Sequence, residues 1–181
     1  YGFAGFAAAD IELTEIPELA EARSHADNIN QLSDAKNFLI LLNPENYTYK
    51  SDFIAALAAT NYDVIIMDVD FHENISFSQA DIDRLSQKAN GAKRLVIAYL
   101  SIGEAEVYRG YWQEEWYDSP PEWMKEENRH WDGNYIVEYW QEEWQDIVLY
   151  SETSMAKRIL NAGFDGVYLD IVDGYENFEN K

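Results

Sequence analysis

The sequence of 181 residues contains no cysteine, and this absence excludes two kinds of site. Without cysteine the chain can form neither a disulfide framework nor a metal site built on thiolates. It also lacks any apolar run close to the roughly 20 residues that a membrane-spanning helix needs. We therefore expect no membrane span and no cysteine chemistry.

Basic residues are scarce as well. Lysine and arginine number 13 against 34 aspartates and glutamates, which gives a formal net charge of -21. A surface of this sign repels phosphate groups, which argues against binding to nucleic acid or to an anionic membrane through charge. A neutral or cationic partner suits this charge, and so does a surface that only keeps the protein soluble.

Patterns typical of metal or nucleotide sites are also missing. His25, His72 and His130 are scattered, so no two of them have the spacing of metal ligands. A site could begin only at His72, which stands near Asp68 and Asp70. There is no glycine-rich phosphate loop and no Ser-His-Asp order. The sequence therefore predicts no metal and no cofactor.

Short apolar runs alternate with amphipathic stretches from residue 38 onward, after a polar stretch at 1–37 that we interpret as an N-terminal arm. Four runs are typical of buried strands: 38–42, 62–70, 94–101 and 166–172. Helices are predicted to begin at Ser51, at Ser78 with a capping box to Asp81, and near Tyr139, the last ending at Gly163. Because parallel strands need long crossovers, this order predicts an α/β domain over 38–181 with helices on a parallel sheet.

Acidic residues follow three of these four runs. They are Asp68 and Asp70, Glu104 and Glu106, and Asp170 and Asp173. Ligands of α/β proteins bind at the carboxyl ends of the strands, so we expect the six acids to surround one cleft. Any one acid could instead cap the next helix, but their clustering favours a site.

Three other side chains are expected near this cleft. Tyr99 and Tyr168 are predicted to line its floor, because alternation along a strand places Tyr168 on the face of Asp170 and turns Val167 and Leu169 toward the helices. Arg109 could hold a carboxylate through a bidentate bond, or could form an ordinary surface ion pair.

All six tryptophans lie in an insertion at 104–144, which also contains the hexapeptide YWQEEW twice, at 111–116 and 139–144. We interpret the two copies as amphipathic helix starts, in which Trp112 and Trp116, and likewise Trp140 and Trp144, share a face. Two roles are open for these rings. They could pack in the core, or they could form a platform on which a sugar stacks beside the acidic cleft.

Four segments together resemble one enzyme family. They read LVIAYLSIGEAEVYRGYW, PEWMKEEN, WDGNYIVEYWQEEWQDIV and GFDGVYLDIVDGY. They resemble glycoside hydrolases related to endo-α-1,4-polygalactosaminidase, a family that includes extracellular proteins once labelled as related to cysteinyl-tRNA synthetase. No HIGH-like or KMSKS-like synthetase motif is present in the sequence.

The resemblance runs from about Phe38 to the end of the sequence and implies a (β/α)8 TIM-type barrel, of which this chain would cover about the first half. It also implies an extracellular protein and a polysaccharide substrate, a cationic or N-acetylated polymer of galactosamine. Asp170 would be a catalytic acid and Asp173 its neighbouring candidate, with a second acid on a later strand beyond Lys181.

Glycoside hydrolysis ordinarily uses two carboxyl groups, and within this chain Glu104 could serve as the catalytic partner of Asp170. Alternatively, Glu104 and Asp68 bind sugar hydroxyls or tune Asp170. The candidate substrate-binding residues are Asp68, Asp70, Tyr99, Arg109, Trp112, Trp140 and Tyr168. Three hypotheses follow: a glycoside hydrolase, a non-catalytic carbohydrate-binding protein that lacks the second acid, or a structural α/β module whose acids only cap helices.

Overall fold

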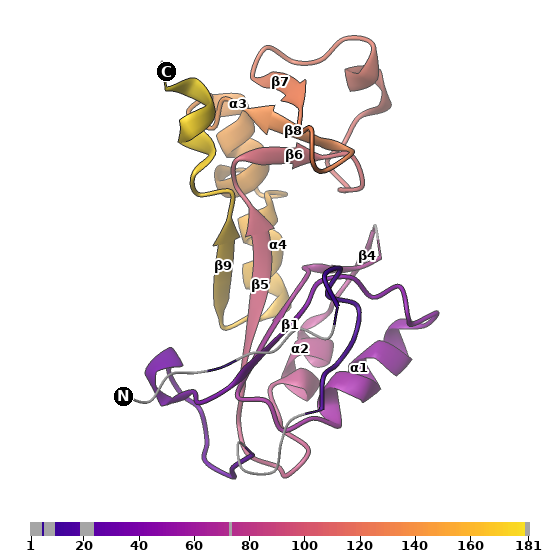
Figure 1. Cartoon of the computed structure of the whole chain (residues 1–181), viewed down its shortest axis with the longest axis vertical. Helices are drawn as coiled ribbons and strands as arrows, with labels where there is room; N and C mark the ends of the chain where they lie inside the picture. Colours follow the sequence, from indigo (N-terminus) through magenta and orange to yellow (C-terminus); the bar gives the residue numbers. More distant parts are fainter. Residues whose placement is uncertain (1–4, 6–9, 19–23, 73, 180–181) are drawn as a thin grey trace. The chain divides into compact units, whose positions relative to one another are not determined.

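The computed structural model describes residues 5, 10–18, 24–72 and 74–179 (Figure 1). The chain forms two compact units. The first consists of Tyr1–Tyr99 with Ile159–Tyr168, and the second of Leu100–Arg158 with Leu169–Lys181. Among the described residues, no helix is both long and apolar enough to cross a membrane.

The main sheet has four strands in the order β1-β2-β5-β9. These are β1 (Phe38–Leu41), β2 (Val64–Met67), β5 (Leu95–Ser101) and β9 (Gly166–Asp170). β1 pairs in parallel with β2 and β2 with β5, with Phe38 opposite Val64 and Val64 opposite Leu95. β9 follows β5 in the sheet, and the Asp165 N–H donates to Val96 O at its start. The predicted α/β architecture with a parallel sheet is confirmed.

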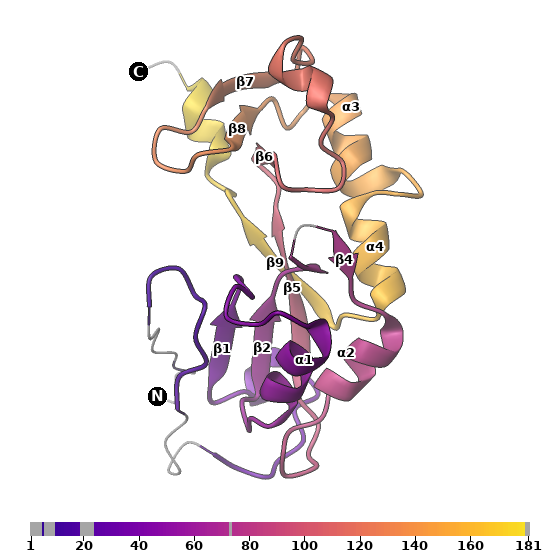
Figure 2. The ribbon, with the colours of Figure 1, turned by 90° about the vertical axis from the view of Figure 1, so that its right-hand side faces the viewer.

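Helices α1 (Lys50–Ala58) and α2 (Gln79–Leu85) cover one face of this sheet (Figure 2). α2 begins with the predicted capping box, in which the Asp81 N–H donates to Ser78 Oγ and the Ser78 N–H to the Asp81 carboxylate. Ile65 and Met67 alternate with Val64 and Ile66 along β2, so the two pairs point to opposite faces.

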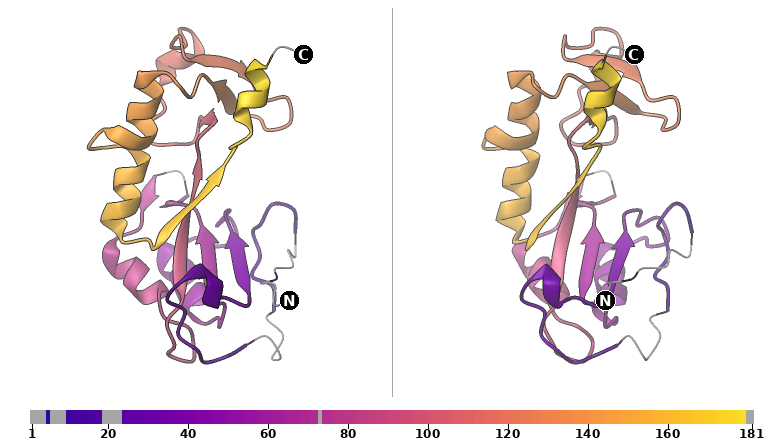
Figure 3. Two further views of the ribbon diagram at one scale, coloured as in Figure 1. Left: turned by 90° about the vertical axis from the view of Figure 1, so that its left-hand side faces the viewer. Right: turned by 60° about the vertical axis from the view of Figure 1, so that its left-hand side comes forward.

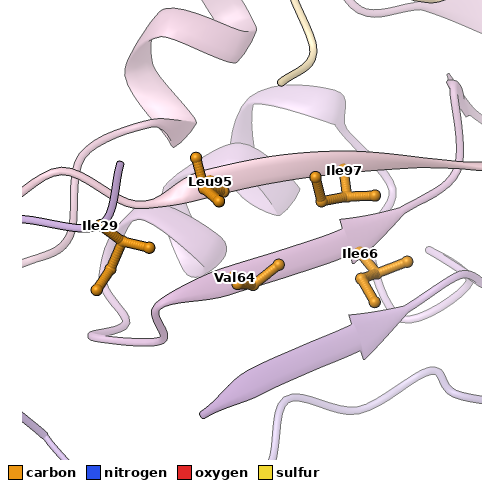
Figure 4. Close-up of a cluster of buried hydrophobic side chains, with 5 residues drawn as sticks. All are labelled: Ile29, Val64, Ile66, Leu95 and Ile97. Atoms are coloured by element: carbon orange, nitrogen blue, oxygen red, sulfur yellow. The ribbon is translucent and has the colours of Figure 1, made fainter. Parts of the chain in front are cut away.

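The face opposite to that of Ile65 and Met67 carries a second cluster of buried side chains: Ile29, Val64, Ile66, Leu95 and Ile97 (Figure 4). Ile29 is fully buried, although it belongs to the stretch that the sequence predicts as a polar arm. Residues 1–4, 6–9 and 19–23 of that arm lie outside the described part of the chain. The boundary of the arm at residue 37 stays a prediction.

A buried ionic cluster connects residues 25–36 with the rest of the first unit. The Asp63 carboxylate accepts hydrogen bonds from Lys88 Nζ (2.6 Å) and the Lys36 N–H (2.8 Å), and lies 2.7 Å from His25 Nε2. Burial by itself raises the pKa of Asp63. The hydrogen bonds from Lys88, the Lys36 N–H and His25 lower this pKa by more than burial raises it, so the net shift is downward. Asp63 is therefore held as a carboxylate in the interior.

β9 is more exposed than the sequence predicts. Val167, Tyr168 and Leu169 are 41%, 44% and 48% exposed, although we expected a buried strand whose Val167 and Leu169 face helices. β9 is the last strand in the order of the sheet, so β5 is its one neighbour among the described strands. The described residues therefore leave a large part of the apolar surface of β9 uncovered.

The second unit contains a small antiparallel sheet in the order β6-β8-β7. Its strands are β6 (Glu104–Glu106), β8 (Asn134–Val137) and β7 (Met124–Glu127). The 3-10 helix η5 (Gly174–Phe178) lies beside β8 (Figure 3). A second 3-10 helix, η3 (Glu114–Tyr117), precedes β7.

The long helix predicted from Tyr139 to Gly163 is interrupted. The structure has α3 (Glu142–Gln145), a π-helical turn η4 (Asp146–Tyr150) and then α4 (Met155–Ala162). Ser154 separates the last two, because its Oγ donates to Leu149 O and accepts from the Lys157 N–H at the start of α4. The apolar periodicity continues across this break, although η4 ends at Tyr150 with Ser151 as its C-cap.

Candidate active site

The second unit brings the end of β9 to the turn between β5 and β6. Asp170 is the last residue of β9, and its carbonyl oxygen accepts a hydrogen bond from the Ile102 N–H at 3.2 Å. Glu104 begins β6 two residues after Ile102. One main-chain bond therefore places the two segments that carry Asp170 and Glu104 side by side. The Asp170 side chain is partly buried there.

The indole of Trp144 supports this turn from α3. Its Nε1 donates to Ile102 O at 3.0 Å, and the side chain is only 1% exposed. Ile102 is thus held at both of its main-chain groups: its N–H donates to Asp170 O, and its carbonyl oxygen accepts from Trp144. A fixed main chain on both sides is what a catalytic carboxylate needs in order to keep one orientation.

Glu104 is buried, with 3% of its surface exposed, and both carboxylate oxygens accept hydrogen bonds from amides. Asn128 Nδ2 donates to one oxygen at 2.7 Å and Asn134 Nδ2 to the other at 3.3 Å. The two asparagines are joined by their main chains, since the Asn128 N–H donates to Asn134 O at 2.7 Å. The NH2 group of an asparagine only donates, so both bonds use the Glu104 carboxylate as an acceptor.

Glu106 is buried on the same strand and is held by two neighbouring side chains. Arg109 Nε lies 2.6 Å from Oε2, and the Tyr108 hydroxyl donates to Oε1, also at 2.6 Å. The Arg109 guanidinium lies 5.0 Å from the centre of the Tyr108 ring. Arg109 is 5% exposed and pairs with a buried carboxylate, so the alternative of an ordinary surface ion pair does not describe it.

Asp173 lies at the start of η5 and is exposed. Its side chain makes no capping bond to that helix. The reading of Asp173 as a helix cap is therefore not supported. Its role as a second candidate acid beside Asp170 stays a prediction.

Four predicted site residues belong to the first unit: Asp68, Asp70, Tyr99 and Tyr168. Asp68 Oδ1 accepts from the Asp70 N–H at 2.9 Å, and the buried Asp70 accepts from the Ser76 hydroxyl at 3.0 Å in the hairpin of β3 (Asp70–Phe71) and β4 (Ile75–Ser76). The rings of Tyr99 and Tyr168 stack with centres 6.4 Å apart. That these groups and the acids of the second unit surround one cleft stays a prediction.

Four of the six tryptophans pack against one another in the second unit, and two of them, Trp123 and Trp144, are buried. Trp112 contacts Trp116, Tyr117 and Tyr135 with ring centres 5.2 to 5.3 Å apart, and Trp123 contacts Trp116 and Trp144 at 5.3 and 5.1 Å. For Trp112, these contacts therefore account for much of the ring surface. Burial also raises the pKa of the Tyr135 hydroxyl, and Glu127 and Tyr117 raise this pKa further.

Trp140 differs from Trp144, contrary to the expectation that the two share a helix face. Trp140 precedes α3 and is 46% exposed, with ring contacts to Tyr139 and Phe178 at 5.1 and 4.7 Å. The prediction was wrong because the helix begins at Glu142, so spacing by four does not apply to Trp140. An exposed indole beside a second aromatic ring can stack on a sugar.

Sequence reasoning missed Asn128, Asn134 and Tyr108. The two asparagines flank the turn WDG, in which Gly133 has φ +80° and a hairpin was recognisable, but no pattern indicated that their amides point at Glu104. In the described part of the chain, no group of three or more histidines, aspartates and glutamates is arranged to hold a metal ion.

Comparison of the sequence with known proteins shows the family of the chain. The model of glycoside-hydrolase family GH114 matches residues 20–181. The chain is 39% identical over 154 residues to an uncharacterized protein of Methanocaldococcus jannaschii, MJ1477, a match that covers 84% of this chain and 42% of that protein. It is 33% identical over 133 residues to an uncharacterized protein of Deinococcus radiodurans, covering 74% of this chain and 40% of the relative.

A third uncharacterized protein, from Thermotoga maritima, is 44% identical over 80 residues, which are 44% of this chain and 24% of that protein. The chain therefore spans less than half the length of these curated relatives. The family model, in contrast, extends over most of the chain and includes Glu104, Glu106 and Asp170. By that match, the chain belongs to glycoside-hydrolase family GH114.

Proposed function

We propose that this protein cleaves a galactosamine-containing polysaccharide and that Asp170 is one of its catalytic acids. The observation that carries the proposal is the hydrogen bond between the Ile102 N–H and Asp170 O, which holds this carboxylate-bearing strand end at the turn before Glu104. Membership in a glycoside hydrolase family supports the reaction class. A polymer of this kind would be met outside the cell, and we propose that location.

Asp170 requires a second carboxyl group, one of the pair donating a proton and the other acting as nucleophile or activating water. Glu104 is buried and accepts amide bonds at both oxygens, so its carboxylate is already engaged in holding the neighbouring segments together. We therefore propose that Glu104 organises the turn, and that the partner of Asp170 comes from a further strand of a (β/α)8 barrel.

Two features of the main sheet support such a barrel. β9 lies at one edge of the described sheet, with apolar side chains 41% to 48% exposed. An apolar groove of about 330 Å³ also runs between residues 30–32 and β9, and Ile66, Ile97 and Val167 contribute to its lining. A strand paired with β9 would satisfy its open edge and cover these side chains.

The charge and one groove of the second unit favour a cationic amino sugar. The net charge of the chain is -21. A groove of about 240 Å³ is lined by Glu122, Trp123, Gln141, Glu142 and Glu143, next in sequence to the exposed Trp140. Carboxylates attract an ammonium group, and the indole offers a face for the sugar ring.

The test is turnover of a galactosamine polymer, supplied both N-acetylated and deacetylated, by the full-length protein and its Asp170→Asn variant. Asp170→Asn should lower kcat by about 1,000-fold or more and leave the melting temperature nearly unchanged, because a neutral amide keeps the shape but transfers no proton. Glu176→Gln, an exposed acid in the following helix η5, is the matched control and should retain full activity. Undiminished turnover by Asp170→Asn would refute the proposal.

The exposed Trp140 supports a second candidate, a carbohydrate-binding protein without catalysis. In that case no variant shows turnover, and binding of the polymer survives Asp170→Asn. Trp140→Ala should then weaken binding by about tenfold, since one stacked ring contributes roughly 1 to 3 kcal/mol. Trp131→Ala is the control, because Trp131 is similarly exposed, at 57%. Unchanged affinity in Trp140→Ala would exclude this ring as the platform.

A further inference from the structure

The main chain takes an unusual conformation directly after Asp170. Ile171 has φ +54°, in the left-handed region, where a β-branched side chain is rarely found. Glycine or asparagine ordinarily occupies such a position, because the isoleucine side chain crowds its own backbone there. Conformations of this kind persist only when the surrounding structure enforces them, and they cluster at functional sites.

Two glycines of the second unit enclose Ile171. A Cβ on Gly103 would lie 2.6 Å from both Ile171 Cγ2 and Ile171 O, a distance that real side chains do not adopt. A Cβ on Gly174 would lie 3.3 Å from Ile171 Cγ2 and 3.5 Å from the Cα of Gly103. The isoleucine is therefore packed between Gly103, which must lack a side chain for it to fit, and Gly174, where an added Cβ would be a tight contact.

Hydrogen bonds close the same arrangement on both sides. The Gly174 N–H donates to Ile171 O at 3.1 Å, and the Ile102 N–H donates to Asp170 O at 3.2 Å. Gly103 lies between Ile102 and Glu104, so the residue that makes room for Ile171 belongs to the turn that holds Asp170. The contacts thus link the left-handed residue to the two segments that carry the acids.

We propose that Gly103, Ile171 and Gly174 form a steric lock that positions Asp170. The lock consists of the Ile171 side chain held between the two glycines, and it sets the direction in which the chain leaves β9 and hence the direction of the Asp170 carboxylate. This role rests on the proposed function of Asp170. The three residues touch no substrate and act through Asp170, so they are positioning residues rather than catalytic ones.

The lock makes a graded prediction for the full-length enzyme. Gly103→Ala should lower kcat by about 100-fold with KM changed less than about threefold, because a displacement near 1 Å of a catalytic group costs this much. Gly174→Ala should have the same effect in a weaker form, since its Cβ would have 3.3 Å of space instead of 2.6 Å. Ile171→Gly removes the wedge without adding bulk and should lower kcat by about tenfold.

Gly91→Ala is the matched control. Gly91 has φ +87° and no heavy atom within 4 Å of the position that a Cβ would take, so alanine there strains the backbone of the first unit without touching this site. It should lower Tm by a few degrees, about what a single strained residue costs, and leave kcat unchanged. Loss of kcat in Gly103→Ala or Gly174→Ala is then not a general effect of replacing a glycine by alanine.

The outcomes separate the lock from the proposed function. If the wild type is active and Asp170→Asn is not, full kcat in both Ile171→Gly and Gly174→Ala overturns the lock alone. Should Gly103→Ala fail to fold, those two variants still decide. An inactive wild type, or an active Asp170→Asn, overturns the proposed function, and the lock with it, because no catalytic acid is then left to position. In the active protein, a shift in the pH profile of kcat/KM in Ile171→Gly further supports the lock.

Discussion

Replacing Lys88 by methionine should strongly destabilise the first unit, because it leaves the carboxylate of Asp63 in the interior without its ammonium partner. The side chains of Lys88 and Asp63 are both 0% exposed, and Lys88 Nζ lies 2.6 Å from Asp63 Oδ1. Lys88 Nζ also donates to the carbonyl oxygens of Asp27 (3.0 Å) and His25 (3.4 Å). Methionine has a similar length but donates to none of these three acceptors.

The expected loss follows from what remains around Asp63. Removing one partner of a buried ion pair costs about 3 to 5 kcal/mol. Asp63 keeps the Lys36 N–H at 2.8 Å and His25 Nε2 at 2.7 Å, so we expect the lower end, about 3 kcal/mol. In Lys88→Met/Asp63→Asn the carboxylate that lost its ammonium partner is removed as well, and this double variant should be more stable than Lys88→Met alone.

The pH dependence should change in a defined direction. Burial raises the pKa of Asp63, but its hydrogen bonds, with that from Lys88 foremost, lower it below the usual value in the folded protein. A lowered folded pKa contributes stability above the unfolded value of about 4, and this stability is lost as the pH falls through the folded pKa. Without Lys88 the effect of burial prevails, so Lys88→Met should approach the wild type in stability as the pH falls from 7 to 4.

Urea unfolding followed by far-UV circular dichroism is the suitable assay, because all six tryptophans lie between residues 112 and 144 and their fluorescence reports the second unit. Lys36→Met is the control. It removes an exposed ammonium that pairs with Asp27, keeps the Lys36 N–H, and should leave the midpoint nearly unchanged. A loss below about 1 kcal/mol for Lys88→Met, or a double variant less stable than the single one, would refute this reasoning.

Two further changes test the second unit. Trp144→Ala should lower the free energy of unfolding by about 3 to 5 kcal/mol, because the buried side chain leaves a cavity and Ile102 O loses its donor. Trp140→Ala, at an exposed position, should lower it by less than about 1 kcal/mol. Equal losses in urea unfolding would contradict this packing. Asn128→Asp places a second carboxyl group against Glu104, and two like charges at this distance repel each other. The variant should therefore be about 1 to 3 kcal/mol less stable than the wild type at pH 7, and this difference should largely disappear at pH 4, where the pair can take up a proton. Asn128→Ala should lack this pH dependence, and the same loss at both pH values in Asn128→Asp would speak against the like-charge pair.

Much of the first unit could be predicted from local patterns. The apolar runs at 38–42, 62–70 and 94–101 contain β1, β2 and β5, because continuous apolar residues indicate strands covered on both faces. The capping box of Ser78 and Asp81 was recognisable because its two partners are three residues apart. These features depend on neighbours within one element, and the sequence contains all the residues that form them.

Local patterns were insufficient where a residue stands outside the element that its spacing suggests. Trp140 matches Trp144 at a distance of four, but α3 begins at Glu142, and the two rings differ in exposure, 46% against 1%. In β9 the apolar residues predicted a buried strand, yet burial depends on neighbours that the pattern does not contain. Helix starts and strand neighbours are decided by competition among contacts across the unit.

The sequence by itself determined the family, the parallel α/β sheet and the presence of acids after its strands. Only the tertiary structure decided which groups those acids meet. Glu104 finds Asn128 24 residues away, and Asp63 finds Lys88 and His25 at separations of 25 and 38 residues. Periodicity indicates secondary structure over a few turns or strands, whereas partners this distant are chosen by how the elements pack, because a buried carboxylate is stable only where packing supplies its donors.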